Sequence, residues 1–502
     1  MQIREEIRPM NVLLIYPECP DTFWSFKHFL KFIGQKAVSP PLGLLTVAAM
    51  LPSQWSKRLV DMNIREVTEE DLAWADYALI SAMIVQRDSA KKVIAQCKEA
   101  GIKIVAGGPL FTIEYEQFEE VDYFVLNEAE VTLPSFLADF ERGHAKRIYT
   151  TAEFADIETT PIPLWELADL KQYHLRSIQF SRGCPHDCDF CDVTALFGHN
   201  PRHKNTEQII AELDSLYYDH KWRGYIFFVD DNLIGSKRYF KTELLPALIE
   251  WQKDKGNIPF NTQVSINLAD DEQLMRMMHE AGFDTVFIGI ETPDDNVLAE
   301  CGKSQNRNRN LIEDVQRIQR FGLQVQGGFI IGFDGDTPSI FEQQIDFIQK
   351  SGIVTAMVGL LQAFPNTRLY ERLKMENRLL DEKFGELVET TTNIDSIMNH
   401  EMMLNGYIKV LRHIYSPANY YQRVKTLLKD LKSPKVKAPL EFRFILGFLR
   451  SIYVLGFKEK ERMQYWKLLS WTLFHRPSLL LVAIVLTLHG YHFRTVCEQR
   501  IF

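Results

Sequence analysis

The chain has 502 residues, of which 46% are hydrophobic, and its 57 basic and 66 acidic residues give a net charge of −9. At ~150 residues per domain this length predicts about three domains, and the apolar content is ample for buried cores. Seven cysteines, three close together and four scattered, do not make a disulfide framework. The charged opening MQIREEIRPM lacks the apolar core of a signal peptide, so we expect a reducing, cytoplasmic location.

The first 150 residues predict a doubly wound α/β domain, because short apolar runs alternate with helical patterns. The expected strands are 11–17, 57–61, 77–82, 103–109 and 123–130, and the expected helices include 42–51, 90–100 and 133–142. Ligands of this fold bind beyond the carboxyl ends of the strands. No G-x-G-x-x-G turn follows the first strand, so a dinucleotide ligand is not expected.

After a linker at 151–172, residues 181–192 read SRGCPHDCDFCD, in which Cys184, Cys188 and Cys191 have the spacing C-x3-C-x2-C. Three thiolates on one short loop can hold three irons of a 4Fe-4S cluster and leave the fourth iron open to a small ligand. Zinc prefers four closed ligands in two separated pairs, and a ferredoxin needs a fourth cysteine nearby, whereas the next one is Cys301. The spacing therefore favours a reactive iron–sulfur cluster over a zinc site or a chance cluster of cysteines.

Residues 173–380 predict a partial barrel of six parallel strands with helical crossovers. The expected strands are 177–181, 224–229, 260–264, 285–290, 324–331 and 356–361, and the expected helices include 206–218, 270–281, 310–321 and 340–351. Catalytic residues of a barrel lie at the carboxyl ends of its strands. The sequences VDDN (229–232), GIET (289–292) and GGFIIGF (327–333) stand at these ends, and their polar and glycine residues favour a ligand site.

The cysteine spacing and its preceding Arg-Gly resemble the radical S-adenosylmethionine (SAM) superfamily. This resemblance implies that the open iron binds SAM and that SAM is cleaved to a 5′-deoxyadenosyl radical, which takes hydrogen from unactivated carbon. It also implies SAM contacts at Phe190, Asp230, Glu291, Gly327 and Gly328. The VDDN sequence lacks the glycines common in the family, so the match at Asp230 is partial. The sequence KSQN, with Lys303, Gln305 and Asn306, resembles a further family signature to which we assign no role.

The first domain, with its PPLGLLTVAA run and its AGGP and NEAE turns, resembles the cobalamin-binding domain of cobalamin-dependent radical SAM enzymes. Many cobalamin proteins place a histidine on cobalt with an Asp-x-His-x-x-Gly motif, which is missing here, so we expect no histidine ligand from this domain. The resemblance implies cobalamin contacts at the strand ends, although each residue could equally be an ordinary turn residue. The expected contacts are Ser81, Gln86, Gly107, Gly108, Asn127, Glu128 and Glu130.

Residues 381–502 predict a helical domain that is both apolar and basic. From residue 421 onward 15 Lys and Arg stand against 5 Asp and Glu, which is +10, so the rest of the chain carries −19. The apolar window between Arg476 and Arg494 is shorter than the ~20 residues of a spanning helix. Two interpretations stay open: a helical cap on the barrel, which could line a pocket for an apolar substrate, and peripheral contact with an anionic membrane surface. Nucleic acid is not an expected partner, because the helices carry too much bulk apolar surface.

The order of domains resembles a family of cobalamin-binding radical SAM proteins with a helical carboxyl-terminal extension, which includes hopanoid 2-methylases and bacteriochlorophyll side-chain methylases. We therefore expect a methyltransferase acting on an unactivated carbon of an apolar substrate, a lipid or a tetrapyrrole. Its expected cofactors are a 4Fe-4S cluster, SAM and cobalamin, and its expected electron donor is a flavodoxin or ferredoxin. No general base is predicted, because radical abstraction does not require one.

Three alternatives share part of this pattern. A cobalamin-dependent radical cyclase or rearrangement enzyme would share every motif. A methylthiotransferase is disfavoured, because its first domain normally supplies three more cluster cysteines, and residues 1–150 contain only Cys19 and Cys97. A cobalamin-binding sensor with a vestigial barrel is disfavoured by the intact cysteine triad.

Overall fold

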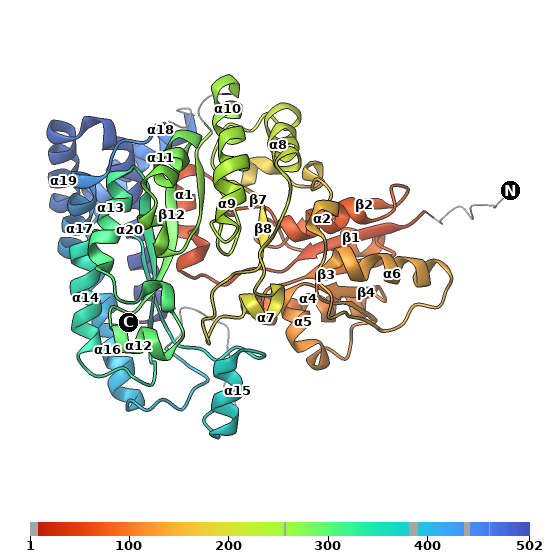
Figure 1. The fold of residues 1–502 in the computed structure, drawn as a ribbon. Helices are drawn as coiled ribbons and strands as arrows, with labels where there is room; N and C mark the ends of the chain where they lie inside the picture. The colour runs from red at the N-terminus through yellow and green to blue at the C-terminus, as the bar shows by residue number, and fades with distance from the viewer. Residues whose placement is uncertain (1–8, 256–257, 381–389, 436–441, 461) are drawn as a thin grey trace. The chain divides into compact units, whose positions relative to one another are not determined.

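The computed structural model describes residues 9–255, 258–380, 390–435, 442–460 and 462–502 (Figure 1). These residues form two compact units. The first unit holds the described residues up to Pro20 together with Lys36–Tyr173 and Arg202–Trp222, and the second holds Asp21–Gln35, His174–Pro201 and Arg223–Phe502. The units depart from the domains expected from sequence mainly at two segments, 21–35 and 202–222. The expected boundaries at 150, 172 and 380 stay predictions.

The first unit is a doubly wound α/β domain, as the sequence predicts. Its strands, all parallel, stand in the order β2-β1-β3-β4-β5-β6. They are β1 (Asn11–Tyr16), β2 (Ser56–Asp61), β3 (Tyr77–Ser81), β4 (Lys103–Gly107), β5 (Tyr123–Val125) and β6 (Ile148–Tyr149). The helices between them are α2 (Leu42–Met50), α3 (Glu69–Trp74), α4 (Arg87–Glu99), α5 (Pro109–Glu114) and α6 (Ala129–Glu141). The strand order reverses between β1 and β3, and ligands of such sheets bind at this switch point.

Successive residues of β1 explain why this sheet is covered on both faces. Leu13 and Ile15 belong to one apolar core, and Val12 and Leu14 belong to a second core on the opposite face. All four side chains are fully buried. Side chains of a strand alternate between the two faces of a sheet, so a continuous apolar run is buried only where helices cover both faces.

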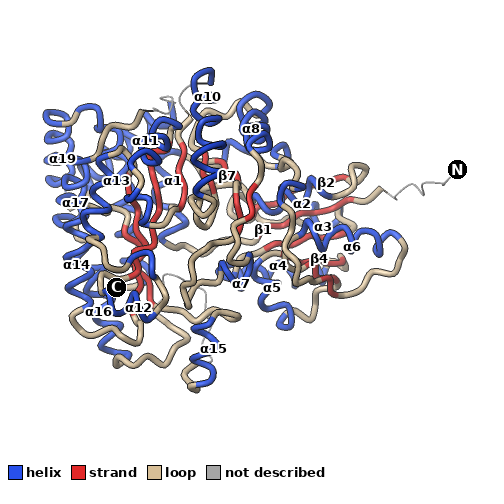
Figure 2. The backbone as a smooth tube through the Cα atoms, viewed as in Figure 1, coloured by secondary structure: helices blue, strands red, loops and turns tan. Residues whose placement is uncertain are grey.

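The second unit contains a six-stranded parallel sheet in the order β14-β13-β12-β11-β10-β7, which confirms the partial barrel (Figure 2). Its strands are β7 (Arg176–Ile178), β10 (Ile226–Phe228), β11 (Phe260–Gln263), β12 (Phe283–Glu291), β13 (Gln324–Ile331) and β14 (Ala356–Leu360). Its helices are α7 (Val193–Phe197), α9 (Lys237–Tyr239), α10 (Leu245–Lys255), α11 (Glu272–Ala281), α12 (Asp295–Glu300), α13 (Leu311–Arg320), α14 (Ile340–Ser351) and α15 (Arg368–Met375). Two short strands, β8 (Ser181–Arg182) and β9 (Arg202–His203), and helix α8 (Thr206–Asp214) lie between β7 and β10 in the chain.

The carboxyl-terminal part of the second unit is helical, as expected. It comprises α16 (His400–Ile414), α17 (Pro417–Asp430), α18 (Phe442–Ser451) with a π-helical continuation (Ile452–Lys458), α19 (Arg462–His475) and α20 (Leu480–Arg500). An early segment of the chain, the 3-10 turn Phe23–Ser25 and α1 (Lys27–Ile33), packs with these helices. Arg450 fixes one contact by donating to the Phe32 carbonyl oxygen at 2.8 Å.

One stretch of the described chain, Pro477–Arg500, is long and apolar enough to cross a membrane. In its most apolar window, however, 56% is buried inside the protein. Phe493 and Cys497 of this helix are fully buried, and Tyr420 of α17 donates to the Leu486 carbonyl oxygen at 2.7 Å. These contacts are those of a core helix of a helical domain.

Candidate radical SAM and cobalamin site

The cysteine loop begins at β8 and is anchored by Asp230. This carboxylate, fully buried just after β10, accepts hydrogen bonds from the Phe180 amide at 3.1 Å, the Ser181 hydroxyl at 2.6 Å and the Ser181 amide. Gly183 has φ +94°, and a Cβ there would lie 2.9 Å from the Gly198 carbonyl oxygen, so only glycine fits. Asp230 was expected at SAM; in this structure these hydrogen bonds position the loop before the first cysteine.

The donor set of the loop fits an iron–sulfur cluster. Cys184, Cys188 and Cys191 are free thiols, and Cys188 is buried. Burial raises the pKa of all three thiols, so the loop holds them protonated until a metal displaces the protons. Around the loop three buried polar atoms have no hydrogen-bond partner within the described chain: His186 Nε2, Asp189 Oδ1 and Gln305 Oε1. Such unsatisfied atoms are typical of a site that a bound group completes.

Cys301 lies beside this loop although it is distant in sequence. Its carbonyl oxygen accepts a hydrogen bond from the Asp189 amide at 3.1 Å. Its thiol turns away, because it donates to the Leu298 carbonyl oxygen at 3.8 Å and belongs to an apolar core with Phe333. Burial raises the pKa of Cys301 to about 12. The structure therefore keeps three thiols at the loop and the fourth in the core.

Glu291 reaches the cysteine loop through a bulge at the end of β12. The pairing register with β13 shifts between Gly289 and Glu291, and Glu291 has φ +63°. Its side chain, 9% exposed, folds back over Gly289, where a Cβ would lie 2.2 Å from Glu291 Oε1. The carboxylate then forms an ion pair with Lys303 Nζ at 2.6 Å. This strained residue is the one at which the sequence predicted a SAM contact.

The KSQN segment, to which the sequence analysis assigned no role, holds Glu291 and the bulge at the end of β12 in place. Lys303 pairs with Glu291 and lies 6.0 Å from the centre of the Phe190 ring. Gln305 Nε2 lies 3.8 Å from Cys188 Sγ. Asn306 donates to the carbonyl oxygens of the bulge, at 3.0 Å to Gly289 and 3.1 Å to residue 290. Phe190 itself packs edge-on against Phe333 with ring centres 5.7 Å apart.

Asp231, next to Asp230, is a further candidate for the site that the sequence analysis did not select. Burial, then the neighbouring Asp230 and Asp192 carboxylates, raise its pKa to about 7. A cationic ligand would stabilise its charged form, so Asp231 suits an ammonium group better than the fully bonded Asp230. The VDDN sequence contains both acids, but which of the two faces the site depends on packing.

Gly327 and Gly328 lie in the middle of β13 rather than at its end. A Cβ at Gly327 would lie 3.1 Å from Ile353, and one at Gly328 would lie 3.0 Å from the Phe287 ring. Side chains of the same unit therefore lie against both glycines. The two residues alternate in the strand, so Gly328 shares a face with its pairing partner Gly289.

The residues expected to contact cobalamin lie at the carboxyl ends of β3 and β4 or in the segments that follow β3, β4 and β5 in the first unit. Ser81 and Gly107 end β3 and β4. A Cβ at Gly108, which has φ +89°, would lie 2.5 Å from Ser81 Oγ, so these two loops approach closely. Gln86 is buried, accepts from the Met83 amide at 2.8 Å and donates to the Pro17 carbonyl oxygen. That last bond joins the loops after β1 and β3, at the switch point of the sheet.

The acidic turn after β5 is held by local bonds. Asn127, with φ +62°, accepts from the Thr150 hydroxyl at 2.8 Å. Glu128 is buried and accepts from the Ala155 amide at 2.7 Å and from Arg202 at 2.9 Å. Glu130 accepts from the Thr160 hydroxyl at 2.8 Å. These bonds shape the edge of the binding loop, so contact of these side chains with cobalamin stays a prediction.

The histidines of the first unit are His144, His203 and His220. The absence of a histidine ligand to cobalt from this domain stays a prediction. The glycine pair, the closely spaced loops and the switch point agree with a broad flat ligand at this edge.

The comparisons with known proteins agree with this geometry. Residues 35–137 match the B12 binding domain, residues 178–348 match the radical SAM superfamily, and residues 367–501 match a domain of unknown function, DUF4070. An uncharacterized methyltransferase of Synechocystis is 40% identical, with 98% of this chain and 93% of that protein covered. The hopanoid C-2 methylase of Rhodopseudomonas palustris is 33% identical, with 91% and 88% covered. The chain belongs to the cobalamin-binding radical SAM family.

Two more distant proteins agree with this assignment. The bacteriochlorophyllide d C-12(1)-methyltransferase of Chlorobaculum tepidum is 24% identical, with 78% of this chain and 86% of that protein covered. The solved structure of the radical SAM methyltransferase TsrM from Kitasatospora setae, with cobalamin and a 4Fe-4S cluster bound, has the same fold. Its TM-score is 0.65 at 14% identity, with 98% of this chain and all of that chain covered.

As a family member this protein is an enzyme, a cobalamin-dependent radical SAM methyltransferase. Its cofactors are a 4Fe-4S cluster, SAM and cobalamin. The cyclase alternative is less well supported, because a matching cyclase covers 53% of this chain whereas the methylases cover most of it. The expected family, fold class and cofactors are thus confirmed.

Proposed function

We propose that this methyltransferase acts on an unactivated carbon of a fused-ring apolar molecule, a polycyclic lipid or a tetrapyrrole. The observation that carries the proposal is an aromatic shelf beside the Glu291–Lys303 corner. Trp24 lies with its ring centre 5.0 Å from that of Phe287 on β12, and 42% of Trp24 is exposed. An exposed tryptophan held against a buried strand is suited to stacking on a flat apolar molecule.

The strand beneath this shelf has one fully buried face and one partly exposed face. On β12, Val286 and Ile288 are fully buried, whereas Phe287 and Gly289 are partly exposed and face the other side. Gly289 pairs with Gly328 of β13; the Glu291–Lys303 ion pair lies over Gly289, and the Phe287 ring lies against Gly328. The Trp24–Phe287 pair beside this ion pair offers an aromatic surface to apolar rings, and the fused rings of a substrate lose little conformational entropy on binding.

The names of two relatives support the same class of substrate, since one methylates a hopanoid and another a bacteriochlorophyllide. When bound, the cluster with SAM supplies hydrogen abstraction, and cobalamin supplies the methyl group. The protein's own residues hold and orient these cofactors. Cys184, Cys188 and Cys191 would hold the cluster, and Asp231 and Glu291 would hold the ammonium group of SAM. Lys303 would offset the charge of Glu291 beside the thiols.

The substrate proposal is tested by anaerobic turnover. The protein is reconstituted with iron, sulfide and hydroxocobalamin, reduced with SAM, and offered a pentacyclic hopanoid, a chlorin tetrapyrrole or free tryptophan. We expect mass spectrometry to find one added CH2 unit on an apolar substrate, together with 5′-deoxyadenosine and S-adenosylhomocysteine. Trp24→Ala should raise the KM for that substrate at least tenfold and leave SAM binding unchanged, whereas Trp471→Ala should change neither. Methylation of tryptophan alone would contradict the proposal.

We further propose that the second unit contacts an anionic lipid surface through an exposed apolar face. On α18 and its π-helical continuation, exposed apolar side chains recur every three or four residues, which is one helical face. The face consists of Phe442, Ile445, Leu449, Tyr453 and Phe457. The helices that follow expose further apolar side chains: Met463, Leu473 and Phe474 on α19 and Leu481 and Val485 on α20. Exposed basic residues accompany it: Arg450, Lys458, Lys460, Arg462 and Lys467. Apolar side chains flanked by cations suit anionic lipid.

Vesicle flotation distinguishes this contact from a bare helical cap. We expect the cluster-loaded protein to float with phosphatidylglycerol vesicles. With phosphatidylcholine vesicles it should remain in the bottom fraction. The double variant Phe457→Glu/Phe474→Glu should bind at least tenfold more weakly. Each carboxylate removes an apolar contact with the lipid and is repelled by the anionic headgroups. Met375→Glu is the control, since Met375 is equally exposed on α15 outside this face. Equal flotation of all three proteins would show that this face does not bind the vesicles.

A further inference from the structure

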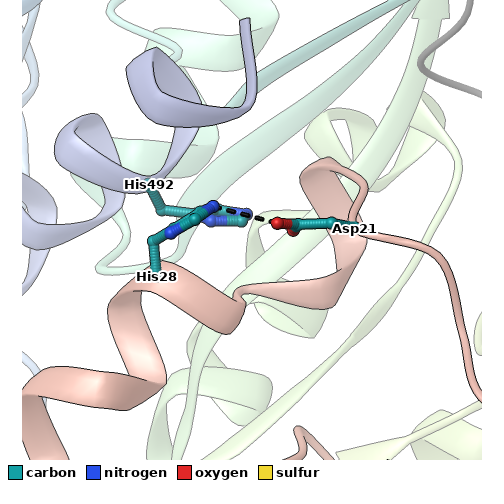
Figure 3. Close-up of side chains that lie close together, drawn as sticks. All are labelled: Asp21, His28 and His492. Carbon is teal, nitrogen blue, oxygen red and sulfur yellow. Dashed lines mark ion pairs between the residues drawn. The ribbon is translucent and has the colours of Figure 1, made fainter. Parts of the chain in front are cut away.

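A second group of metal-binding side chains lies in the second unit, apart from the cysteine loop. Asp21 precedes the 3-10 turn, His28 lies on α1 and His492 lies on α20 (Figure 3). One potential ligand atom from each residue lies within 4.8 Å of the other two. Nothing in the methyl-transfer chemistry uses these residues.

The bonds of these side chains leave a ligand position open. His28 Nε2 lies 3.0 Å from Asp21 Oδ2, and Ser25 donates to Asp21 Oδ1 at 2.8 Å. His492 is fully buried, and its Nε2 lies 3.1 Å from the Phe23 carbonyl oxygen. A carbonyl oxygen only accepts, so Nε2 carries the hydrogen. The lone pair of His492 Nδ1 then has no partner within the described chain.

We infer that Asp21, His28 and His492 form a binding site for a divalent transition cation of the zinc class. Two imidazoles and one carboxylate are zinc ligands, at bond lengths that place neighbouring ligand atoms ~3.4 Å apart. The Asp21 and His28 atoms already meet this spacing, so closure requires a movement of about an ångström, chiefly by His492. The supporting bonds expected around a metal ligand are present, from Ser25 to Asp21 and from His492 to the Phe23 carbonyl.

The burial of the three groups agrees with this role, because His28 and His492 are buried and Asp21 is partly buried, so a metal held by them would be shielded from solvent. The competing explanation is a metal-free ion pair between Asp21 and protonated His28, which would leave His492 Nδ1 unsatisfied.

The position of the site indicates a structural role for a bound metal. Its ligands come from both ends of the chain, so a bound metal would tie the segment Asp21–Gln35 to the last helix. The same segment carries Trp24, whose ring lies against Phe287. A metal here would stabilise the second unit and fix the aromatic shelf.

The test uses cluster-loaded protein, in which the cysteines are occupied, and cobalt(II) and zinc(II) as probes. We expect one equivalent of cobalt, with visible ligand-field bands and no added sulfur charge-transfer band, and a melting temperature that rises with zinc. His492→Ala should weaken cobalt binding at least tenfold and abolish the rise, whereas His489→Ala, on the same helix, should retain both. If His492→Ala does not fold, His28→Gln provides the comparison, because glutamine can still bond to Asp21.

Failure to bind cobalt, or equal affinity in wild type and in the His28 and His492 variants, would overturn the proposal. Because the readouts are metal binding and melting, they do not depend on turnover. A protein that binds cobalt here and methylates no apolar substrate would contradict the substrate proposal alone.

Discussion

At the scale of single residues, the Glu291–Lys303 ion pair is the feature on which the site depends. Both side chains are largely buried, at 9% and 13% exposure. Burial disfavours the charge on Lys303, but the Glu291 carboxylate outweighs it and raises the pKa of Lys303. Removing one member of a buried ion pair is strongly destabilising, because the other charge is left unpaired in a low dielectric.

Lys303→Met should therefore destabilise the protein by about 3–5 kcal/mol, the cost of an unpaired buried carboxylate. The measurement is urea unfolding followed by circular dichroism. Adding Glu291→Gln to Lys303→Met should restore most of the loss, since no charge is then left unpaired. A double variant as unstable as the single variant would show that packing of the lysine stem, rather than charge, holds this corner.

A buried histidine predicts the dependence of stability on pH. Burial first, and then Lys432 and Lys435, lower the pKa of His279 to about 4, against an ordinary value of 6.5. The unfolded chain therefore binds the proton more readily than the fold does, so the free energy of unfolding falls as pH drops from 6.5 toward 4. Between pH 7.5 and 5.5 this group should contribute a loss of about 1 kcal/mol. His279→Gln should reduce that loss in urea midpoints, whereas the exposed His400→Gln should not.

At the scale of secondary structure elements, the bulge at the end of β12 positions the site. Asn306 satisfies the carbonyl oxygens that the bulge releases from the sheet, and Gly289 leaves room for the returning Glu291 side chain. Bulges redirect single side chains near active sites, and this one turns Glu291 toward the cysteine loop.

Gly289→Ala should disturb this arrangement. The added Cβ would lie 2.2 Å from Glu291 Oε1 and 2.8 Å from Lys303 Nζ, so the ion pair must move. We expect the affinity for SAM, measured by calorimetry on the reconstituted protein, to fall at least tenfold. Gly359→Ala on β14 is the matched control, because a Cβ there meets nothing within 4 Å. Unchanged SAM affinity in Gly289→Ala would remove Glu291 from the SAM site.

At the scale of the whole molecule, α20 completes the second unit. Gly490 lets α20 approach α17, since a Cβ there would lie 2.4 Å from the Tyr420 ring. Residues on one side of the helix are buried, including Ala483, Phe493 and Cys497. The helix proposed from the sequence as a membrane contact is therefore largely a core element, although Leu481 and Val485 on it are exposed.

Removing residues 477–502 should consequently unfold part of the second unit instead of merely releasing it from lipid. We expect aggregation or a melting temperature lowered by at least 10 °C, because several fully buried side chains would lose their partners. Leu481→Lys, at an exposed position of the same helix, should leave the melting temperature within about 2 °C. A truncated protein with unchanged melting would mean that α20 contributes little to this core.

Local patterns in the sequence determined the cysteine loop, the two sheets and the helical end. A cluster motif is a matter of spacing within eight residues, and a buried strand shows itself as an apolar run, so neither needs knowledge of distant contacts. The family resemblance added the cofactors, which the comparisons confirm. The strand ends that carry the site could be located in the same way.

Tertiary structure alone decided which side chains meet there. It bonds Asp230 to the loop and leaves Asp231 nearby, pairs Glu291 with Lys303, and turns the Cys301 thiol into the core. It also joins the segment Asp21–Gln35 to the last helix. Apart from the bond between Cys301 and Leu298, these contacts join residues from 12 to about 470 positions apart, and packing rather than local preference selects them.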